Sequence, residues 1–407
     1  MTKKKKHFTI VCYTFPPSKA IGGRRWAKFC QQLAKKGHDV SVITTDMNEN
    51  QNWYLQHFEN ISFHFLDAKY PNWLEAPKGF FEKLKYRIYI KFLNSFFKHN
   101  LFDKAFRWEK QLLKELSSVH SKKEIDYLIV TGAPFSLLYF GTLFKSKHPK
   151  VKLISDFRDP WTWGFYYGLN ELKGKKKSFQ QFMERQTIEK SDLVCYPTQE
   201  MGEDLLKIYP NYQNRFKVIP HAYDEEKISG IKGDHIRKGF IYGGSLYPGI
   251  ESYLEKLEKV IHSHKNFKWE IYTGAPETAV NNIFKGGNVH HNGLIDEQEL
   301  FRKIKNSSAY LAFFPESDKD LISTKFFEII YLETPIIIVV EEGAVGKFIR
   351  ENQLGVHILP KDIEKEFPKY LDGTVPFNKG IFDVSRFEYS KVTDLLIQSC
   401  ESLEGNQ

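Results

Sequence analysis

The stretch HFTIVCYTFPPSKAIGGRRWAKFCQQLAKKGHDVSVIT, residues 7–44, decides the fold class. It opens with apolar, β-favouring residues, and a helical pattern then runs from about Gly23 to Lys36 and ends at Gly37. DVSVIT, residues 39–44, predicts a second strand. Short apolar strands separated by a helix are typical of a parallel sheet, so this β-α-β opening predicts an α/β domain.

The same alternation continues along the chain in two series. The further strands expected lie at 126–130, 151–155 and 192–196, and then at 239–244, 269–274, 309–314 and 335–340. A length of 407 residues suits two domains better than one. We therefore expect two Rossmann-like domains with parallel sheets facing across a cleft, at residues 1–222 and 223–385, and a terminal helix at 386–407 that crosses back toward the first domain.

Composition limits the class and the location of the protein. The net charge of +9 and the pI of about 9.0 favour an anionic partner such as phosphate, nucleic acid or a lipid surface. The sequence contains no uninterrupted run of ~18 apolar residues, so we expect no membrane-spanning helix. The short N-terminal apolar run lacks a signal-peptide cleavage site. The cysteines show no metal-binding or CxxC spacing, which favours reduced thiols in a cytoplasmic protein; they are Cys12, Cys30, Cys195 and Cys400.

One Gly-Gly pair follows the first strand of each of the two series. Gly22 and Gly23 stand before the first helix, while Gly243 and Gly244 precede Ser245 in YGGSLYPG. In open α/β sheets, ligands bind at such loops, and glycines allow the backbone and nearby hydroxyls to approach a phosphate. A tight turn without a ligand explains each pair equally well. The absence of GxGxxG and GxxxxGK[ST] disfavours a classical dinucleotide enzyme or P-loop NTPase.

Charged residues also follow the strand at 151–155. The stretch ISDFRDPWTWG places Asp156, Arg158 and Asp159 beside two tryptophans. Asp159 is suited to orienting or deprotonating a hydroxyl, and Arg158 to holding a phosphate. The alternative is an Arg/Asp pair that only fixes the loop.

The stretch STKFFEIIYLETPIIIV, residues 323–339, predicts a helix followed by a strand. Lys325 and Glu328 lie three residues apart on one face of that helix, whereas Glu333 is expected to be exposed. Lysine can neutralise a diphosphate, and a carboxylate can accept hydrogen bonds from both ribose hydroxyls. An ordinary salt bridge on a solvated face is the alternative.

A basic and aromatic stretch at residues 80–108 predicts an amphipathic helix. Such a helix suits the surface of an anionic bilayer, and a buried core helix is the alternative. Its basic stripe consists of Lys83, Arg87 and Lys91, beside Leu84, Ile88 and Phe92. A second basic patch is expected at residues 175–177, and both patches fit a lipid-linked acceptor.

Taken in order, these segments resemble the family 4 retaining glycosyltransferases of GT-B fold. The resemblance covers about residues 7–400 and rests on the first β-α-β unit, SDLVCYPTQEMGEDL, RFKVIPHAYDEE, GFIYGGSLYPG, VHHNGLIDEQELFRKIKNSSAYL and the K-x-x-E helix. It implies transfer of a sugar from a nucleotide-sugar donor, a UDP- or GDP-sugar, to a glycan or lipid-linked acceptor with retention, without bound metal or cofactor. It further implies bacterial surface polysaccharide or glycolipid synthesis at the inner face of the cytoplasmic membrane.

The resemblance also implies roles for particular residues. Donor binding would involve Gly22, Gly23, Gly244, Ser245, Gly293 and Leu294, with Lys325 at the diphosphate and Glu328 at the ribose. Arg158 and Asp159 would lie near the sugar and acceptor, where many members carry a His-Asp pair.

Three positions depart from the family pattern. Asp320 stands where the first of two glutamates is usual, His221 stands where an Asn is common, and no Arg or Lys follows the GGSL loop. Lys325, with Arg24 or Arg25, is left to supply positive charge.

Two other functions remain open at this point. One is a nucleotide-sugar epimerase of the same fold, which would act on the donor alone. The other is a non-catalytic basic protein that binds membrane or nucleic acid. The sequence contains no recognised nucleic-acid-binding motif, and we do not expect nucleic acid as a partner.

Overall fold

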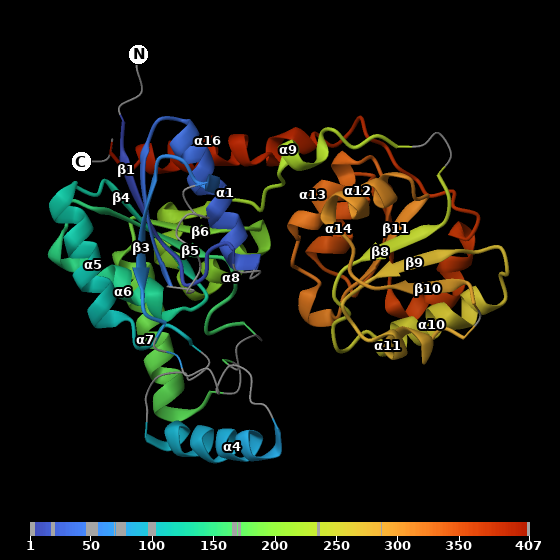
Figure 1. Cartoon of the computed structure of the whole chain (residues 1–407), viewed down its shortest axis with the longest axis horizontal. Helices are drawn as coiled ribbons and strands as arrows, with labels where there is room; N and C mark the ends of the chain where they lie inside the picture. The colour runs from blue at the N-terminus through green and yellow to red at the C-terminus, as the bar shows by residue number, and fades with distance from the viewer. Residues whose placement is uncertain are drawn as a thin grey trace. The chain divides into compact units, whose positions relative to one another are not determined.

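The computed structural model describes residues 5–17, 21–45, 56–68, 70, 79–96, 103–164, 169, 172–233, 237–285 and 287–404. The chain divides into two compact units (Figure 1). Unit 1 consists of Met1–Pro220 and Val392–Gln407, and unit 2 consists of His221–Lys391. The sequence had suggested divisions after residues 222 and 385, a few residues from these positions.

Unit 1 is built on a parallel sheet that has seven strands among the described residues. Its strands, in spatial order, are β3 (Ile61–Leu66), β2 (Asp39–Thr45), β1 (His7–Val11), β4 (Tyr127–Gly132), β5 (Lys152–Phe157), β6 (Leu193–Tyr196) and β7 (Phe216–Val218). The described helices of this unit, besides the last helix of the chain, are α1 (Ile21–Lys35), α4 (Gly79–Phe96), α5 (Glu109–Lys122), α6 (Ser136–Lys147), α7 (Gly174–Lys190) and α8 (Gln199–Ile208).

Unit 2 repeats the plan with six parallel strands in its described part. Their order is β10 (Val289–Asn292), β9 (Trp269–Tyr272), β8 (Phe240–Gly243), β11 (Ala309–Phe313), β12 (Ile336–Val339) and β13 (Gly355–Ile358). The helices are α9 (Glu225–Ile228), α10 (Glu251–His262), α11 (Glu277–Asn281), α12 (Glu297–Lys305), α13 (Thr324–Tyr331), α14 (Ala344–Glu351) and α15 (Ile363–Glu366).

Each sheet has one point where the strand order reverses. In unit 1 this point lies between β1 and β4, and in unit 2 between β8 and β11. Ligands of doubly wound sheets bind beyond the carboxyl ends of the strands at such a point. The loops that follow β1, β4, β8 and β11 are therefore the first places to look for a site.

The central strands are buried throughout, as expected for strands covered on both faces. Every residue of β1, β4, β8, β11 and β12 is buried, and aliphatic and aromatic side chains of each sheet pack into a separate core. The sequence predicted these strands but not the four at the sheet edges, β3, β7, β10 and β13, which are only partly buried.

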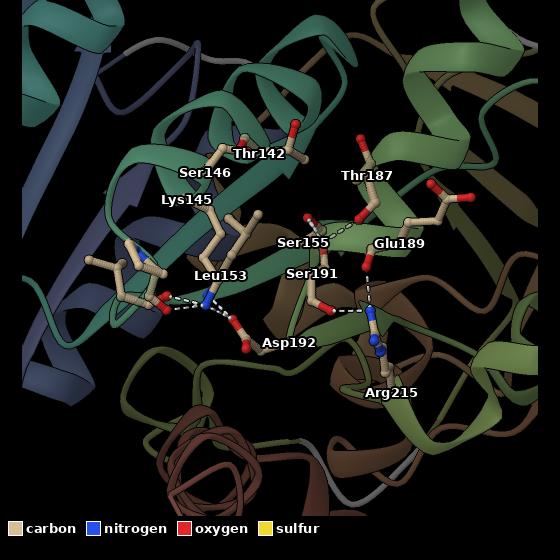
Figure 2. Close-up of polar contacts among 12 residues, drawn as sticks. Thr142, Lys145, Ser146, Leu153, Ser155, Thr187, Glu189, Ser191, Asp192 and Arg215 are labelled. Carbon is tan, nitrogen blue, oxygen red and sulfur yellow. Dashed lines mark hydrogen bonds and ion pairs between the residues drawn. The ribbon is translucent and has the colours of Figure 1, made fainter. Parts of the chain in front are cut away.

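A polar network fixes β5 and β6 at their amino ends (Figure 2). Lys145 on α6 donates hydrogen bonds to the carbonyls of Pro149 and Val151 and to the Asp192 carboxylate, at 2.9, 2.6 and 2.9 Å. Arg215 donates to backbone carbonyls at the end of α7, including that of Glu189 at 2.5 Å. These two cations hold the loops between helices and strands in place.

The last helix, α16 (Tyr389–Glu401), begins in unit 2 and continues into unit 1. Asp394 on this helix forms an ion pair with Lys36 at 2.9 Å. Beyond the helix, Glu404 accepts a hydrogen bond from the Tyr127 hydroxyl at 2.5 Å and pairs with Lys6 at 2.6 Å. The end of the described chain is therefore anchored to β1 and β4 of unit 1.

Candidate active site

The helix that carries Lys325 and Glu328 is α13, which follows β11 at the switch point of unit 2. Ser323 precedes it with extended backbone angles, and Lys325 lies in its first turn. The Lys325 ammonium donates a hydrogen bond to the carbonyl of Gly243, at the end of β8, with a distance of 2.5 Å between Nζ and O. Burial lowers the pKa of Lys325, while the nearby Glu328 opposes that shift. The ammonium therefore lies against the loop after β8.

Glu328 is half-buried one turn later on the same helix. Burial is the main cause that raises its pKa, to about 7, and Glu297 and Asp224 add to the shift, whereas Lys325 and Lys227 oppose it. Lys227 is itself paired with Glu297 at 2.5 Å. Among the described residues, the Glu328 carboxylate has no hydrogen-bond partner. A half-buried carboxylate without such a partner is a candidate ligand-binding group.

The loop Gly243–Gly244–Ser245 is tightly held by protein atoms. The N–H of Gly244 donates to the carbonyl of Tyr272 at 2.9 Å, and the N–H of Gly243 donates to the Tyr310 hydroxyl at 3.1 Å. The N–H groups of Gly243 and Gly244 are therefore bound within the protein, and the expected role of this loop at a phosphate stays a prediction. What Gly244 offers is space, because a Cβ there would lie 2.9 Å from Lys325 Nζ. Ser245 is exposed.

The residues expected beside the base follow β10. Gly293 is exposed, and a Cβ built on it would meet no atom within 4 Å. The side chain of Leu294 is 80% exposed and packs near Gly274, the residue that follows Thr273 after β9. An apolar side chain this exposed is available for contact with a flat apolar ligand surface.

Asp320 lies before α13, in the loop from β11. Its Oδ1 accepts a hydrogen bond from the N–H of Ala344 at 2.8 Å, at the start of α14. A Cβ on the neighbouring Gly343 would lie 2.7 Å from the same oxygen. In this arrangement Asp320 connects the loop before α13 to the loop before α14.

In unit 1, Arg158 and Asp159 follow β5 and pair with each other, at 2.7 Å between Nη2 and Oδ2. The neighbouring Asp156 is fully buried and accepts hydrogen bonds from Trp26 at 2.8 Å and Thr131 at 2.9 Å. These contacts describe the loop geometry, and the chemical roles expected for Arg158 and Asp159 stay predictions.

Arg25 is also buried in unit 1. Its guanidinium donates to the carbonyls of Ile219 and Pro220 at 2.7 and 2.8 Å, and lies 3.8 Å from Asp156 Oδ1. The sequence had suggested Arg24 or Arg25 as additional positive charge for a donor. In the structure the Arg25 guanidinium is bound to unit 1 itself.

Gly22 and Gly23 lie in the first turn of α1. A Cβ on Gly23 would lie 2.6 Å from the carbonyl oxygen of Thr14 and 2.9 Å from Cα of Phe15. Gly23 therefore permits close packing of the helix on the loop after β1. Gly22 precedes Gly23 in the same turn, and the expected role of both glycines in donor binding stays a prediction.

The basic stripe expected at residues 83–92 falls on α4. Lys83 and Arg87 are exposed, as are Phe81, Leu84 and Ile88, at 77%, 45% and 63%. The side chains of Lys91 and Phe92 lie outside the described residues. In Figure 1, α4 lies apart from the sheet of unit 1. Within the described chain, no helix has the length and apolarity needed to cross a membrane.

Sequence reasoning missed two residues of this site, Tyr242 and Tyr310. Both are buried, and their hydroxyls bind the backbone of the loop after β8. The available signal was a pair of tyrosines in otherwise apolar strands, since a buried tyrosine hydroxyl needs a hydrogen-bond partner.

Two Rossmann-like units with parallel sheets, connected by a helix that returns to the first, define a protein of GT-B fold. The chain belongs to Glycosyltransferase Family 4, whose sequence model matches residues 22–227. The chain is therefore a glycosyltransferase. The matched residues lie almost entirely in unit 1, so the assignments in unit 2 depend on geometry.

Solved structures with the same fold include a glycosyltransferase from Rickettsia africae ESF-5, with a TM-score of 0.65, 12% identity and coverage of 99% of this chain and 100% of that one. The lipopolysaccharide outer core galactosyltransferase WaaB matches with a TM-score of 0.61, 13% identity and coverage of 98% and 99%. The UDP-GlcNAc 2-epimerase from Neisseria meningitidis, bound to UDP-GlcNAc, matches with a TM-score of 0.55, 12% identity and coverage of 98% and 100%. No curated protein sequence matches the chain.

Proposed function

We propose that the protein transfers a hexose from a UDP- or GDP-sugar to an acceptor hydroxyl with retention of anomeric configuration. One observation carries this proposal. Lys325 and Glu328 lie on α13, which follows β11 at the point where the strand order of unit 2 reverses, and the Glu328 carboxylate has no hydrogen-bond partner in the described chain. A cation beside a carboxylate at this edge matches the diphosphate and ribose of a nucleotide sugar. UDP-GlcNAc bound to an epimerase of the same fold supports this class of donor.

In this proposal each predicted residue has a chemical role. Lys325 neutralises the diphosphate as the leaving group develops charge, and Glu328 accepts hydrogen bonds from the ribose hydroxyls. Gly244 leaves room for the phosphates, and Ser245 supplies a hydroxyl. Asp320 is assigned to the sugar, and Arg158 and Asp159 to the sugar and the acceptor. Gly293 and Leu294 are assigned to the base.

The direct test is Glu328→Ala. We expect transfer to fall at least a hundredfold and nucleotide affinity to fall as well, because two hydrogen bonds to a charged group contribute about 1.5–3 kcal/mol each. Activity with radiolabelled UDP- and GDP-sugars and binding of UDP and GDP by calorimetry are the measurements. Glu333→Ala is the matched control, since Glu333 instead pairs with Lys379 at 2.9 Å. Wild-type transfer by Glu328→Ala would refute the assignment of the site.

An epimerase is the second candidate because the fold is shared with UDP-GlcNAc 2-epimerase. It would convert the donor in the absence of any acceptor, whereas a transferase requires both substrates for rapid turnover. Incubation of the protein with a nucleotide sugar alone, followed by chromatography, separates the two. Membership in a glycosyltransferase family favours the transferase.

We propose further that the acceptor is a glycan or lipid-linked precursor of a bacterial surface polysaccharide, reached from the inner face of the cytoplasmic membrane. The exposed apolar and basic side chains of α4 support this, since an amphipathic helix with these groups binds anionic bilayers. The lipopolysaccharide galactosyltransferase of the same fold is consistent with such an acceptor.

The surface of α4 can be tested with vesicles. Replacing Lys83, Arg87 and Lys91 by Gln should weaken binding to vesicles containing phosphatidylglycerol, because each basic residue near an anionic surface contributes about 1 kcal/mol. Sedimentation with vesicles at two salt concentrations measures the effect. A control with the same loss of charge on α5, Lys110, Lys114 and Lys122 to Gln, should bind as the wild type does. Equal binding by the α4 variant would contradict the membrane proposal.

A further inference from the structure

Two buried tyrosines hold the turn that follows β8. The Tyr310 hydroxyl, from β11, donates to the carbonyl of Gly243 at 2.7 Å and accepts from the N–H of the same residue at 3.1 Å. The Tyr242 hydroxyl, from β8, donates to the carbonyl of Ser245 at 2.6 Å. The strands β8 and β11 flank the switch point of unit 2, so the tyrosines act where a donor is proposed to bind.

These hydrogen bonds decide which side of the turn faces a ligand. A carbonyl oxygen is the negative end of the peptide dipole, so a carbonyl that points toward a phosphate repels the phosphate. Both carbonyls at the ends of the turn, those of Gly243 and Ser245, are instead bound by tyrosine hydroxyls. The N–H of Gly244 donates to the backbone carbonyl of Tyr272, so the backbone is restrained at three successive residues.

The position of Lys325 depends on the same carbonyl. Its ammonium shares the oxygen of Gly243 with the Tyr310 hydroxyl, at 2.5 and 2.7 Å. The sequence has no Arg or Lys from residue 243 to residue 255, so this loop supplies no other cation. Displacement of the Gly243 carbonyl would therefore displace the charge proposed to face the diphosphate.

We propose that Tyr310 and Tyr242 are positioning residues for the donor diphosphate, acting through the Gly243–Ser245 turn and the Lys325 ammonium. The proposal rests on the proposed function and adds two residues that do not touch the sugar or the base. It separates diphosphate binding from nucleoside binding, because the tyrosines fix only the phosphate side of the site.

The experiment compares Tyr310→Phe, Tyr242→Phe and the double variant with Tyr272→Phe. Tyr272 is the matched control because its hydroxyl donates to Glu270 at 2.5 Å and not to the turn. Binding of pyrophosphate, UDP, GDP, uridine and guanosine is measured by calorimetry, with thermal unfolding as the check of folding. We expect the double variant to bind pyrophosphate and nucleoside diphosphate about tenfold more weakly, with nucleoside affinity unchanged, and Tyr272→Phe to bind all of them as the wild type does.

A double-mutant cycle with Lys325→Met makes the test independent of stability. If the tyrosines act through Lys325, Tyr310→Phe should cost no further pyrophosphate affinity in the Lys325→Met protein. Additive losses, or equal losses for nucleoside and pyrophosphate, would overturn the positioning role even if Glu328→Ala behaves as proposed. Failure of the wild type to bind any nucleotide or pyrophosphate would overturn the proposed function together with this inference.

Discussion

Each unit carries a Gly-Gly pair after the first strand of its switch point, but the two pairs lie in different places and meet different atoms. Gly22 and Gly23 lie in the first turn of α1, whereas Gly243 ends β8 and Gly244 follows it. A Cβ on Gly23 would meet the backbone of Thr14 at 2.6 Å, whereas a Cβ on Gly244 would meet the ends of the Lys325 and Tyr242 side chains at 2.9 and 3.0 Å. In unit 1 the glycine lets two protein segments pack. In unit 2 it leaves space beside a cation.

The charged groups near these pairs differ in the same way. In unit 1, Oδ2 of Asp156 accepts hydrogen bonds from Trp26 and Thr131, its Oδ1 lies 3.8 Å from the Arg25 guanidinium, and Arg25 is bound to carbonyls of its own unit. In the described part of unit 2, the Glu328 carboxylate has no such donor. A buried charge bound by protein supports the fold, whereas one that lacks a hydrogen-bond partner identifies where a ligand fits.

The largest effect on stability is expected from Gly23→Ala. Overpacking typically costs about 1–3 kcal/mol, and alanine returns about 1 kcal/mol through its better helix propensity. Because backbone atoms cannot rotate away from the new methyl group, we expect a cost at the upper end of that range, about 3 kcal/mol, and so a net loss of about 2 kcal/mol in the free energy of unfolding. Urea denaturation measures this loss. An unchanged denaturation midpoint would show that the Gly23 pair is not a packing feature.

Gly244→Ala should have the opposite character. The new methyl group would displace the Lys325 ammonium, which is the flexible end of a side chain, so the fold should survive while nucleotide affinity falls about tenfold, or ~1.4 kcal/mol. Gly230→Ala is the control, because Gly230 has no role in the proposed donor site and a Cβ there meets no atom within 4 Å. Calorimetry with UDP and GDP on both variants checks the difference. Equal affinities in the two variants would remove the distinction between the two Gly-Gly pairs.

The smallest effect, a few-fold, is expected from pH. Because the pKa of Glu328 is raised from 4.5 to about 7, its carboxylate becomes fully charged only above neutral pH, and nucleotide affinity should rise between pH 6 and 8. Stability should change in the other direction, since between the two pKa values the native state binds more protons than the unfolded state and loses stability as pH rises.

The pH prediction is checked by comparing the wild type with Glu328→Gln, using calorimetry for affinity and urea denaturation for stability. The substitution should remove the rise in affinity and make the fall in stability less steep. Asp103 in unit 1 also has a raised pKa, of about 6, through burial, but it remains in both proteins and so cancels in the comparison. A pH-independent affinity in the wild type would contradict the role of the Glu328 carboxylate.

The sequence predicted the central strands because continuous apolar runs such as PIIIVV identify strands buried on both faces. It did not predict the edge strands, since VHHN of β10 and FKV of β7 have no such run and form strands only because a neighbouring strand offers hydrogen bonds. Local patterns identify the middle of a sheet, and pairing with distant residues determines its edges.

The candidate site divides in the same way. Lys325 and Glu328 could be paired from sequence because three residues along a helix place them on one face. The contact of Tyr310 with Gly243 joins residues 67 positions apart, and that of Trp26 with Asp156 joins residues 130 positions apart. Such contacts depend on strand order and side-chain rotamers, which no local pattern contains.

The network around Lys145 and Arg215 has a consequence for how the protein attracts anions from solution. In the formal net charge Lys145 is already cancelled by Asp192, with which it pairs at 2.9 Å, whereas Arg215 keeps its charge although backbone carbonyls at the end of α7 bind it. Removal of Lys145 together with Asp192 leaves the net charge unchanged. Exposed cations such as Lys83 and Arg87 have no such cancelling partner in this network, so association rates with an anionic partner should fall more on their substitution than on loss of the Lys145–Asp192 pair.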